Sequence, residues 1–206
     1  MGMQLKFIDR ASYRRKHEPQ MLEALRDRFG EFYVIPEGGS NLLALDGVAE
    51  MLSEADASTD HIVCACGTGS TLAGLVIAAP ESSMVTGIPV LHAEGTIEAL
   101  VARSVGETQT QWRLQTGYEF GGYAKLDDAL MDFMAGFHKR FGITLDAVYT
   151  AKMFYGLFDM IASGRFERGS VLLAVHTGGL QGNAGFADRL TSHHPDTQSQ
   201  AYRLTI

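Results

Sequence analysis

Short apolar runs of strand length alternate with longer segments that carry apolar residues at helical spacing along most of this 206-residue chain. The clearest run, His61–Cys66, has β-branched residues that suit a buried strand, and an Ala- and Leu-rich segment after Ser70 is typical of a buried helix. The other expected elements are strands at 5–8, 31–36, 85–92 and 170–175, and helices at 20–29, 42–53, 96–104, 126–141 and 151–162. This alternation predicts an α/β fold, with a mostly parallel sheet covered by helices on both faces.

Some stretches do not follow this alternation. Residues 106–115 are polar and carry no clear pattern, and residues 116–124 form an aromatic, glycine-rich loop that is too long for a simple connection. Ser40 and Asn41 are both good candidates to cap the helix that follows them. The end of the chain, which contains His193 and His194, is expected to be a loosely structured tail.

A glycine-rich turn directly follows the central strand and has the chemistry of an anion site. Its residues are Gly67, Thr68, Gly69, Ser70 and Thr71. The glycines allow a tight turn with inward N–H groups, the hydroxyls add donors, and the start of the next helix adds unpaired N–H groups and a positive dipole end. A phosphate is the expected ligand. The alternative is a tight turn that binds nothing, because such turns are common in open α/β sheets.

Neither common nucleotide-binding motif is complete in this turn. The lysine that follows the second glycine of a P-loop is missing, and Leu72 occupies the place of the third glycine in a dinucleotide-binding fingerprint. No acidic residue stands at the expected distance on a second strand either. These departures disfavour a Rossmann-like nucleotide binder.

Three polar turns are expected to meet at one edge of the sheet. Residues 37–40, 67–71 and 176–179 each follow an expected strand. Because ligands of parallel sheets bind at the carboxyl ends of the strands, the three turns together predict a pocket. His176 itself is interpreted as a hydrogen-bonded structural residue rather than a catalyst.

Composition and charge narrow the classes of partner. The chain is 46% hydrophobic and 20% charged, with a formal net charge of −7, and it has no cluster of basic residues for a nucleic acid to bind. Its apolar runs are too short to span a membrane, and its first residues lack the apolar core of a signal peptide. Cys64 and Cys66 are two residues apart on the expected strand, so their side chains lie on the same face. Neither belongs to a recognisable set of metal ligands, and both are expected to be thiols in the core. We therefore expect a cytoplasmic protein without a metal site.

Five segments in order resemble a family of pyridoxal-phosphate (PLP) enzymes that contains D-cysteine desulfhydrase and 1-aminocyclopropane-1-carboxylate deaminase, on the tryptophan-synthase-β-like fold. The segments are 33–41 (YVIPEGGSN), 67–74 (GTGSTLAG), 122–125 (GYAK), 148–152 (VYTAK) and 176–179 (HTGG). The similarity extends from the first residues to about Gly185. Each motif alone is weak, but five in the family's order make a specific signal.

The resemblance implies a role for each matching residue. Gly67, Thr68, Gly69, Ser70 and Thr71 would bind the cofactor phosphate. Tyr149 would lie in the active site, Tyr123 would line the substrate side, and Thr177 would face the pyridine nitrogen with Thr150 nearby. The deaminase branch carries Glu in place of Thr150 and lacks Thr177, so this chain resembles the desulfhydrase branch more closely. From the residues alone, both tyrosines could equally be ordinary half-buried side chains.

The resemblance also implies that part of the usual enzyme is absent. In the family, the lysine that forms a Schiff base with PLP follows Gly-Gly-Asn, and a Ser-Asn pair near the substrate carboxylate lies further on. None of the lysines here has that context; they are Lys6, Lys16, Lys125, Lys139 and Lys152. We interpret 1–30 as a remnant of the smaller domain, 31–190 as the PLP-phosphate-binding large domain and 191–206 as a tail. Lys152 is expected to be structural or solvent-facing.

Two functional hypotheses follow. The first is the C-terminal portion of a PLP-dependent lyase or deaminase that acts on a small amino acid such as D-cysteine and releases pyruvate, ammonia and sulfide. The activity of this chain alone is doubtful because the lysine is absent. The second is a catalytically inactive PLP- or phosphate-binding module, or one half of a split enzyme. The expected partners are the substrate and either a second copy or the missing N-terminal half.

Overall fold

The computed structural model describes residues 4–193 and divides the chain into two compact units, Met1–Ile35 and Pro36–Ile206. The first unit contains helices α1 (Arg10–Arg14) and α2 (Pro19–Phe29). The carboxylate of Asp9 accepts the N–H groups of Ala11 and Ser12 and so caps α1, whereas α2 begins at a proline. No residue of either helix is buried. The interpretation of residues 1–30 as a remnant of a smaller domain stays a prediction.

The strands expected at 5–8 and 31–36 are not present. Both segments have an irregular backbone. Strand propensity reflects how well a side chain fits a paired, half-buried surface, so an apolar run without a neighbouring strand has nothing to stabilise it as a strand.

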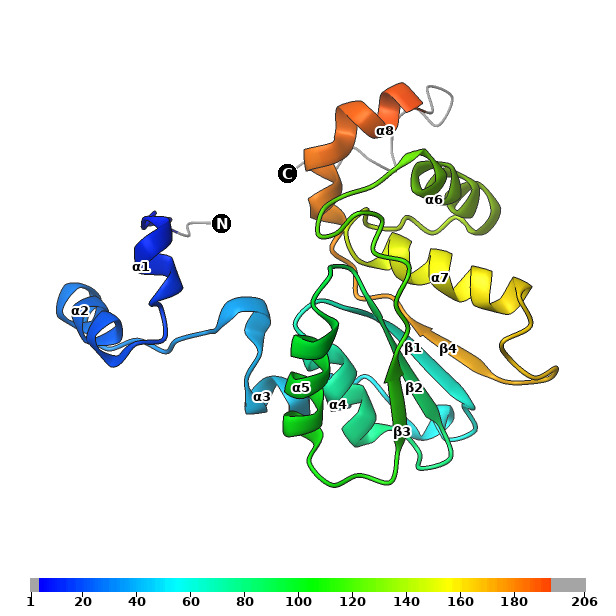
Figure 1. Cartoon of the computed structure of the whole chain (residues 1–206), viewed down its shortest axis with the longest axis horizontal. Coiled ribbons are helices and arrows are strands. Elements are labelled where there is room, and N and C mark those ends of the chain that lie inside the picture. Colours follow the sequence, from blue (N-terminus) through cyan, green and yellow to red (C-terminus); the bar gives the residue numbers. More distant parts are fainter. Residues whose placement is uncertain (1–3, 194–206) are drawn as a thin grey trace. The chain divides into compact units, whose positions relative to one another are not determined.

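The second unit contains a four-stranded parallel sheet of β1 (His61–Cys66), β2 (Met84–Pro89), β3 (Gln111–Leu114) and β4 (Leu172–Val175). The strand order is β3-β2-β1-β4, so β1 is central, with His61 opposite Met84 on one side and opposite Leu172 on the other. The chain first adds strands on one side of β1 and then returns to add β4 on the other side (Figure 1).

Helices cover both faces of this sheet, as predicted. On one face lie α3 (Leu42–Ala49), α4 (Ser70–Ala78) and α5 (Glu94–Val105); on the other lies α7 (Thr150–Ala162), with α6 (Asp128–Phe141) outside it (Figure 1). The side chains of β1 alternate between the two layers. Ile62, Cys64 and Cys66 pack with α4 and α5, whereas Val63 and Ala65 pack against α7.

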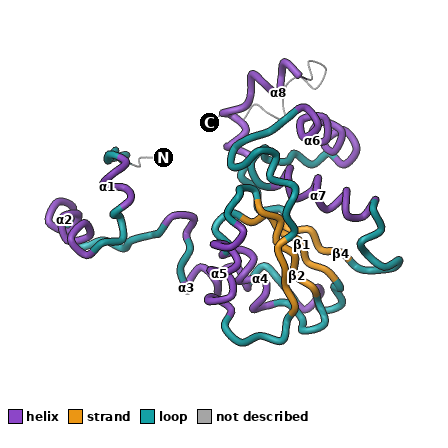
Figure 2. Tube along the Cα trace, in the orientation of Figure 1, coloured by secondary structure: helices purple, strands orange, loops and turns teal. Residues whose placement is uncertain are grey.

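Several element boundaries differ from the expected ones. Strand β3 was missed because it is a short edge strand of alternating exposure in a polar stretch. Helix α3 ends at Ala49 rather than at residue 53, and Asn41 rather than Ser40 caps it by accepting the N–H of Ala44. The loop between β3 and α6 is irregular throughout (Figure 2).

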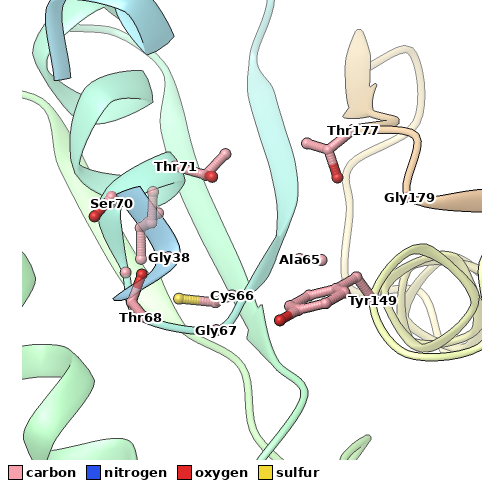
Figure 3. Close-up of a pocket in the computed structure, with 12 residues that line it drawn as sticks. Gly38, Ala65, Cys66, Gly67, Thr68, Ser70, Thr71, Tyr149, Thr177 and Gly179 are labelled. Carbon is pink, nitrogen blue, oxygen red and sulfur yellow. The ribbon is translucent and has the colours of Figure 1, made fainter. Parts of the chain in front are cut away.

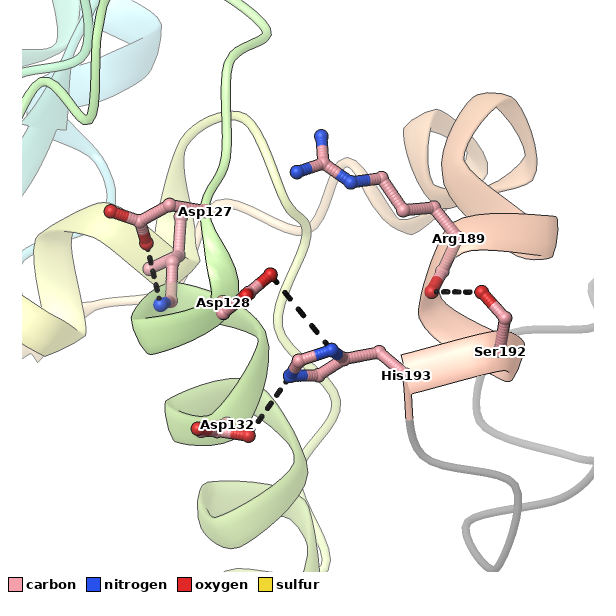
Figure 4. A network of polar contacts seen from close by, with 7 residues as sticks. Asp127, Asp128, Asp132, Arg189, Ser192 and His193 are labelled. Carbon is pink, nitrogen blue, oxygen red and sulfur yellow. Dashed lines mark hydrogen bonds and ion pairs between the residues drawn. The ribbon is translucent and has the colours of Figure 1, made fainter.

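The described chain ends in a short 3₁₀ segment, Leu180–Phe186, and helix α8 (Ala187–His193). His193 on α8 joins it to α6, because its Nε2 lies 3.0 Å from Asp132 Oδ1 and its Nδ1 lies 3.9 Å from Asp128 Oδ1 (Figure 4). Helix α8 therefore extends into the segment expected to be a loose tail, and His194 onward lies outside the described residues. Within residues 4–193, no helix is long and apolar enough to cross a membrane.

Candidate functional site

A cavity of about 280 Å³ lies at the carboxyl ends of β1 and β4 (Figure 3). The connection after β1 leads to a strand on one side of it, whereas β4 pairs on the other side. Open α/β sheets bind ligands where the strand order reverses in this way, because the two connections diverge and leave a crevice. The lining residues are Gly38, Ala65, Cys66, Gly67, Thr68, Gly69, Ser70, Thr71, Leu72, Tyr149, Thr177 and Gly179.

The turn between β1 and α4 forms one wall of this cavity. Gly69 is the N-cap of α4, with φ at +99°, and no side chain caps the helix, so its first N–H groups have no side-chain acceptor. A Cβ on Gly69 would lie 2.9 Å from Val101 Cγ2, and a Cβ on Gly67 would lie 3.1 Å from Tyr149 Cε1. Both its positive φ and the lack of space therefore favour glycine at position 69, whereas a Cβ at position 67 would make a tight contact that the Tyr149 ring would have to relieve by moving slightly.

The second glycine turn packs onto the first one. The hydroxyl of Ser40 donates to Thr68 Oγ1 at 2.8 Å, and a Cβ on Gly38 would lie 2.9 Å from Thr68 Cγ2. The third turn, after β4, contributes Thr177 and Gly179. The structure thus brings together the three turns that the sequence placed at one edge of the sheet, although no strand precedes the turn at Gly38.

Tyr149 stands across the cavity from the start of α4, on the same side as Thr177 (Figure 3). Asp146 holds the backbone beside it, since Asp146 Oδ1 accepts the Tyr149 N–H at 2.8 Å. Burial, followed by hydrogen bonding with Tyr123, raises the pKa of Tyr149 above its ordinary value. Tyr149 is therefore a neutral hydroxyl group beside the glycine turn at physiological pH.

Tyr123 and Thr150 do not line the cavity. The ring of Tyr123 is 57% exposed and makes an edge contact with Tyr149, with centroids 6.1 Å apart. Thr150 is buried, and its hydroxyl donates to Asp146 Oδ2 at 2.7 Å while accepting the Asp146 N–H at 2.8 Å. Thr150 is the first residue of α7, and its hydroxyl bonds to Asp146 at the start of that helix rather than lining the cavity.

His176 is a structural residue. Its Nε2 lies 3.0 Å from the carbonyl oxygen of Thr144, and its Nδ1 accepts the N–H of Gly178 at 3.1 Å. Both ring nitrogens therefore form hydrogen bonds with backbone groups. The bond to Gly178 helps to fix the turn that contains Thr177.

Two residues at the site were not singled out from the sequence. Cys66 was assigned only to the core, but it also lines the cavity, and burial raises the pKa of its thiol to about 12. Asp146 stands three residues before Tyr149, the N-cap of α7, and its carboxylate accepts the N–H groups of Tyr149 and Thr150. Both could have been found from their positions, one at the end of a strand and the other before a helix.

The cavity has an uncharged lining, in which an anion would meet backbone N–H groups and hydroxyls rather than a cationic side chain. None of the five lysines, all of which lie in the described part of the chain, is among the lining residues. Lys152 was expected to be either structural or solvent-facing. Its side chain, on α7, is fully buried, which agrees with a structural lysine and contradicts a solvent-facing one.

Comparison with known proteins finds no matching family model. Curated relatives do match: a Pyrococcus horikoshii protein and a Thermotoga maritima protein, both named provisionally as 1-aminocyclopropane-1-carboxylate deaminases, are 31% and 33% identical to this chain. The 1-aminocyclopropane-1-carboxylate deaminase of Burkholderia vietnamiensis is 29% identical. These alignments cover 86%, 77% and 85% of this chain but only 58%, 55% and 58% of the relatives. The chain thus spans little more than half the length of the curated relatives it matches.

Solved structures agree with this similarity. The crystal structure of an ACC deaminase homologue superimposes with a TM-score of 0.74 at 30% identity, over 92% of this chain and 62% of that one. A hydrogen sulfide-producing enzyme from Fusobacterium nucleatum matches at a TM-score of 0.50 and 16% identity, over 77% of this chain and 56% of that one. The second likeness concerns the fold alone.

Proposed function

We infer that this chain belongs to the PLP-dependent family of 1-aminocyclopropane-1-carboxylate deaminases and D-cysteine desulfhydrases, and from that premise we propose that it is the phosphate-binding part of a PLP-dependent enzyme that acts on a small amino acid. The cavity at the ends of β1 and β4 carries the proposal. It combines the uncapped start of a helix, two glycines at which a Cβ would make close contacts, and hydroxyl groups on both sides. These are the features with which a protein binds a phosphate without a cationic side chain.

The residues present fit the cofactor. The N–H groups at the start of α4, with Thr68 and Thr71, would hold the phosphate, and Thr177 would stand opposite the pyridine nitrogen. Bound PLP would supply an electron sink for the substrate's α-carbon, and a hydroxyl rather than a carboxylate partner leaves the ring nitrogen largely unprotonated. Tyr149 would hold or transfer a proton at its hydroxyl oxygen, which its raised pKa keeps protonated at neutral pH.

The substrate is proposed to be D-cysteine or a related small amino acid. The named relatives favour a deaminase, whereas Thr150 and Thr177 resemble the desulfhydrase branch. In this chain Thr150 is committed to the cap of α7 through Asp146. Release of pyruvate from D-cysteine and of 2-oxobutanoate from 1-aminocyclopropane-1-carboxylate, measured on the same preparation, would separate the two activities.

A second candidate function is a PLP- or phosphate-binding module without chemistry. The absence of every lysine from the cavity lining favours it, because covalent attachment of PLP needs a lysine amine within reach. Borohydride reduction of the chain mixed with PLP, followed by peptide mapping, tests this point. A PLP-labelled lysine would contradict the module hypothesis, and PLP that is removed by dialysis after reduction would support it.

The phosphate assignment is tested by binding. We expect PLP to bind and pyridoxal, which lacks the phosphate, to bind far more weakly in calorimetric titrations of the full chain. Thr71→Val should weaken PLP binding about 10- to 100-fold, since a hydrogen bond to a charged group contributes about 1.5–3 kcal/mol. Thr96→Val, at an exposed site in the first turn of α5, is the matched control and should bind like the unmodified chain. Equal affinity for PLP and pyridoxal would rule out the proposed phosphate site.

A further inference from the structure

The loop between β3 and α6 adopts an unusual backbone. Gly117, Gly121 and Gly122 have φ values of +98°, +85° and +113°, and the two non-glycine residues Phe120 and Ala124 have φ values of +52° and +53°. Positive φ is uncommon for residues with a Cβ and costs free energy, so it persists only where the surroundings impose it. Something must therefore hold this loop in one conformation.

Lys152 meets that requirement. Its side chain is fully buried, and its Nζ donates to the carbonyl oxygens of Glu119 and Gly122, both at 2.7 Å, and to that of Val90 at 3.2 Å. An ammonium group has three protons, and each one has an acceptor here. Two acceptors belong to the loop and the third follows β2, so one side chain of α7 ties the loop to the sheet.

A cation in this position is costly unless it is fully hydrogen-bonded. Burial lowers the pKa of Lys152 to about 8, while the carboxylates of Glu119 and Asp146 act in the opposite direction. The Glu119 carboxylate also accepts the N–H of Gly117 at 3.0 Å, which fixes the beginning of the same loop. A methionine of similar length could fill the volume of Lys152, but it could not bond the three carbonyl groups.

Tyr123 lies directly after one of the bonded carbonyl groups. It is flanked by Gly122 and Ala124, both at positive φ, and its ring contacts that of Tyr149. Lys152 and Tyr149 are three residues apart at the start of one helix. The side chain that holds the loop and the tyrosine that lines the cavity therefore share one rigid support.

We propose that Lys152 is a positioning residue: by bonding the carbonyl groups of Val90, Glu119 and Gly122, it holds Tyr123 against the ring of Tyr149, which lines the cavity. A role for Tyr123 toward a substrate rests on the proposed function. The hydrogen bonds by which Lys152 holds the loop do not depend on that function. Lys152 is the one buried lysine among residues 4–193, and this role is structural rather than the attachment of a cofactor.

The test compares Lys152→Met with Lys139→Met, a substitution of an exposed lysine on α6. Hydrogen exchange followed by mass spectrometry should show amides of residues 117–124 exchanging at least tenfold faster in Lys152→Met, with residues 70–78 of α4 unchanged. Photo-oxidative dityrosine cross-linking, mapped by mass spectrometry, should join Tyr123 to Tyr149 in the unmodified chain and in Lys139→Met, and lose that product in Lys152→Met.

If Lys152→Met does not fold, Lys152→Gln is measured instead, because its amide retains two donor protons; an intermediate increase in loop exchange is expected. Unchanged loop exchange or an unchanged cross-link in a folded Lys152 variant would overturn the proposal. PLP affinity is measured alongside, and Lys139→Met should bind PLP within twofold of the unmodified chain. Failure of PLP to bind any form would overturn the proposed function but leave the result for the loop intact.

Discussion

At the scale of single residues, Asp146 organises more of the site than any residue that lines the cavity. Its carboxylate accepts the N–H groups of Val148, Tyr149 and Thr150 at 3.0, 2.8 and 2.8 Å, and also the hydroxyl of Thr150. The negative charge stands at the positive end of α7, where it is favourable. The direction of Tyr149 thus depends on a buried carboxylate that is not itself among the residues lining the cavity.

Replacing this carboxylate should be costly. We expect Asp146→Ala to lower the free energy of unfolding by about 3 kcal/mol, because three N–H groups, two of them buried, and a buried hydroxyl lose their acceptor. Asp127→Ala removes an exposed cap that accepts one N–H, from Leu130, and should cost only about 1 kcal/mol. Urea unfolding measures both; equal losses in the two variants would contradict the burial argument.

At the scale of elements, the contact between α3 and α4 depends on one glycine. A Cβ on Gly74 would lie 2.5 Å from Val48 Cβ and 3.0 Å from the Leu45 carbonyl oxygen, so the two helices meet with no space for a side chain. Helix α3 follows the turn of Gly38 and Ser40, and α4 begins at the glycine turn after β1. Their close approach therefore keeps two walls of the cavity together.

Adding a methyl group should separate these helices. We expect Gly74→Ala to destabilise the protein by about 1–3 kcal/mol, which is typical of an overpacked core. Gly136→Ala is the matched control, since Gly136 lies in the middle of α6 with nothing within 4 Å of its Cβ position. That variant should gain about 0.5–1 kcal/mol from helix propensity. A gain in thermal stability for Gly74→Ala would show that α3 is not held as described.

At the scale of the whole molecule, the hydrophobic core lies entirely in the second unit. The buried apolar residues range from Leu45 to Leu190, and α1 and α2 contribute none. The sheet, the helices on its two faces and the candidate site are all parts of residues 36–193.

A shortened chain should therefore keep its fold. We expect a variant that begins at Pro36 to unfold cooperatively and to bind PLP with the affinity of the full chain, because it retains every core cluster and every residue that lines the cavity. Circular dichroism during heating and PLP titration measure the two properties. Loss of the cooperative transition would mean that residues 1–35 supply packing that the second unit needs.

Local sequence patterns determined the elements of the central fold. The limits of β1 follow from a run of apolar residues that ends in a glycine turn, and α6 ends at Gly142 as its pattern predicts, because a glycine with φ of +69° terminates the helix there. The gathering of three polar turns at one edge follows from the parallel sheet. The roles assigned to Tyr149, Tyr123 and the threonines at the site stay predictions.

Only the tertiary structure decided how distant segments meet. The apolar runs at 5–8 and 31–36 are not strands because no strand pairs with them, and β3 forms from a polar stretch because β2 does pair with it. Thr150 and Lys152 are two residues apart in the sequence, yet the hydroxyl of Thr150 bonds to Asp146 just before α7, whereas Lys152 holds a loop whose bonded residues lie 30 and 33 positions away. Such contacts join groups far apart in the chain, and local periodicity carries no information about them.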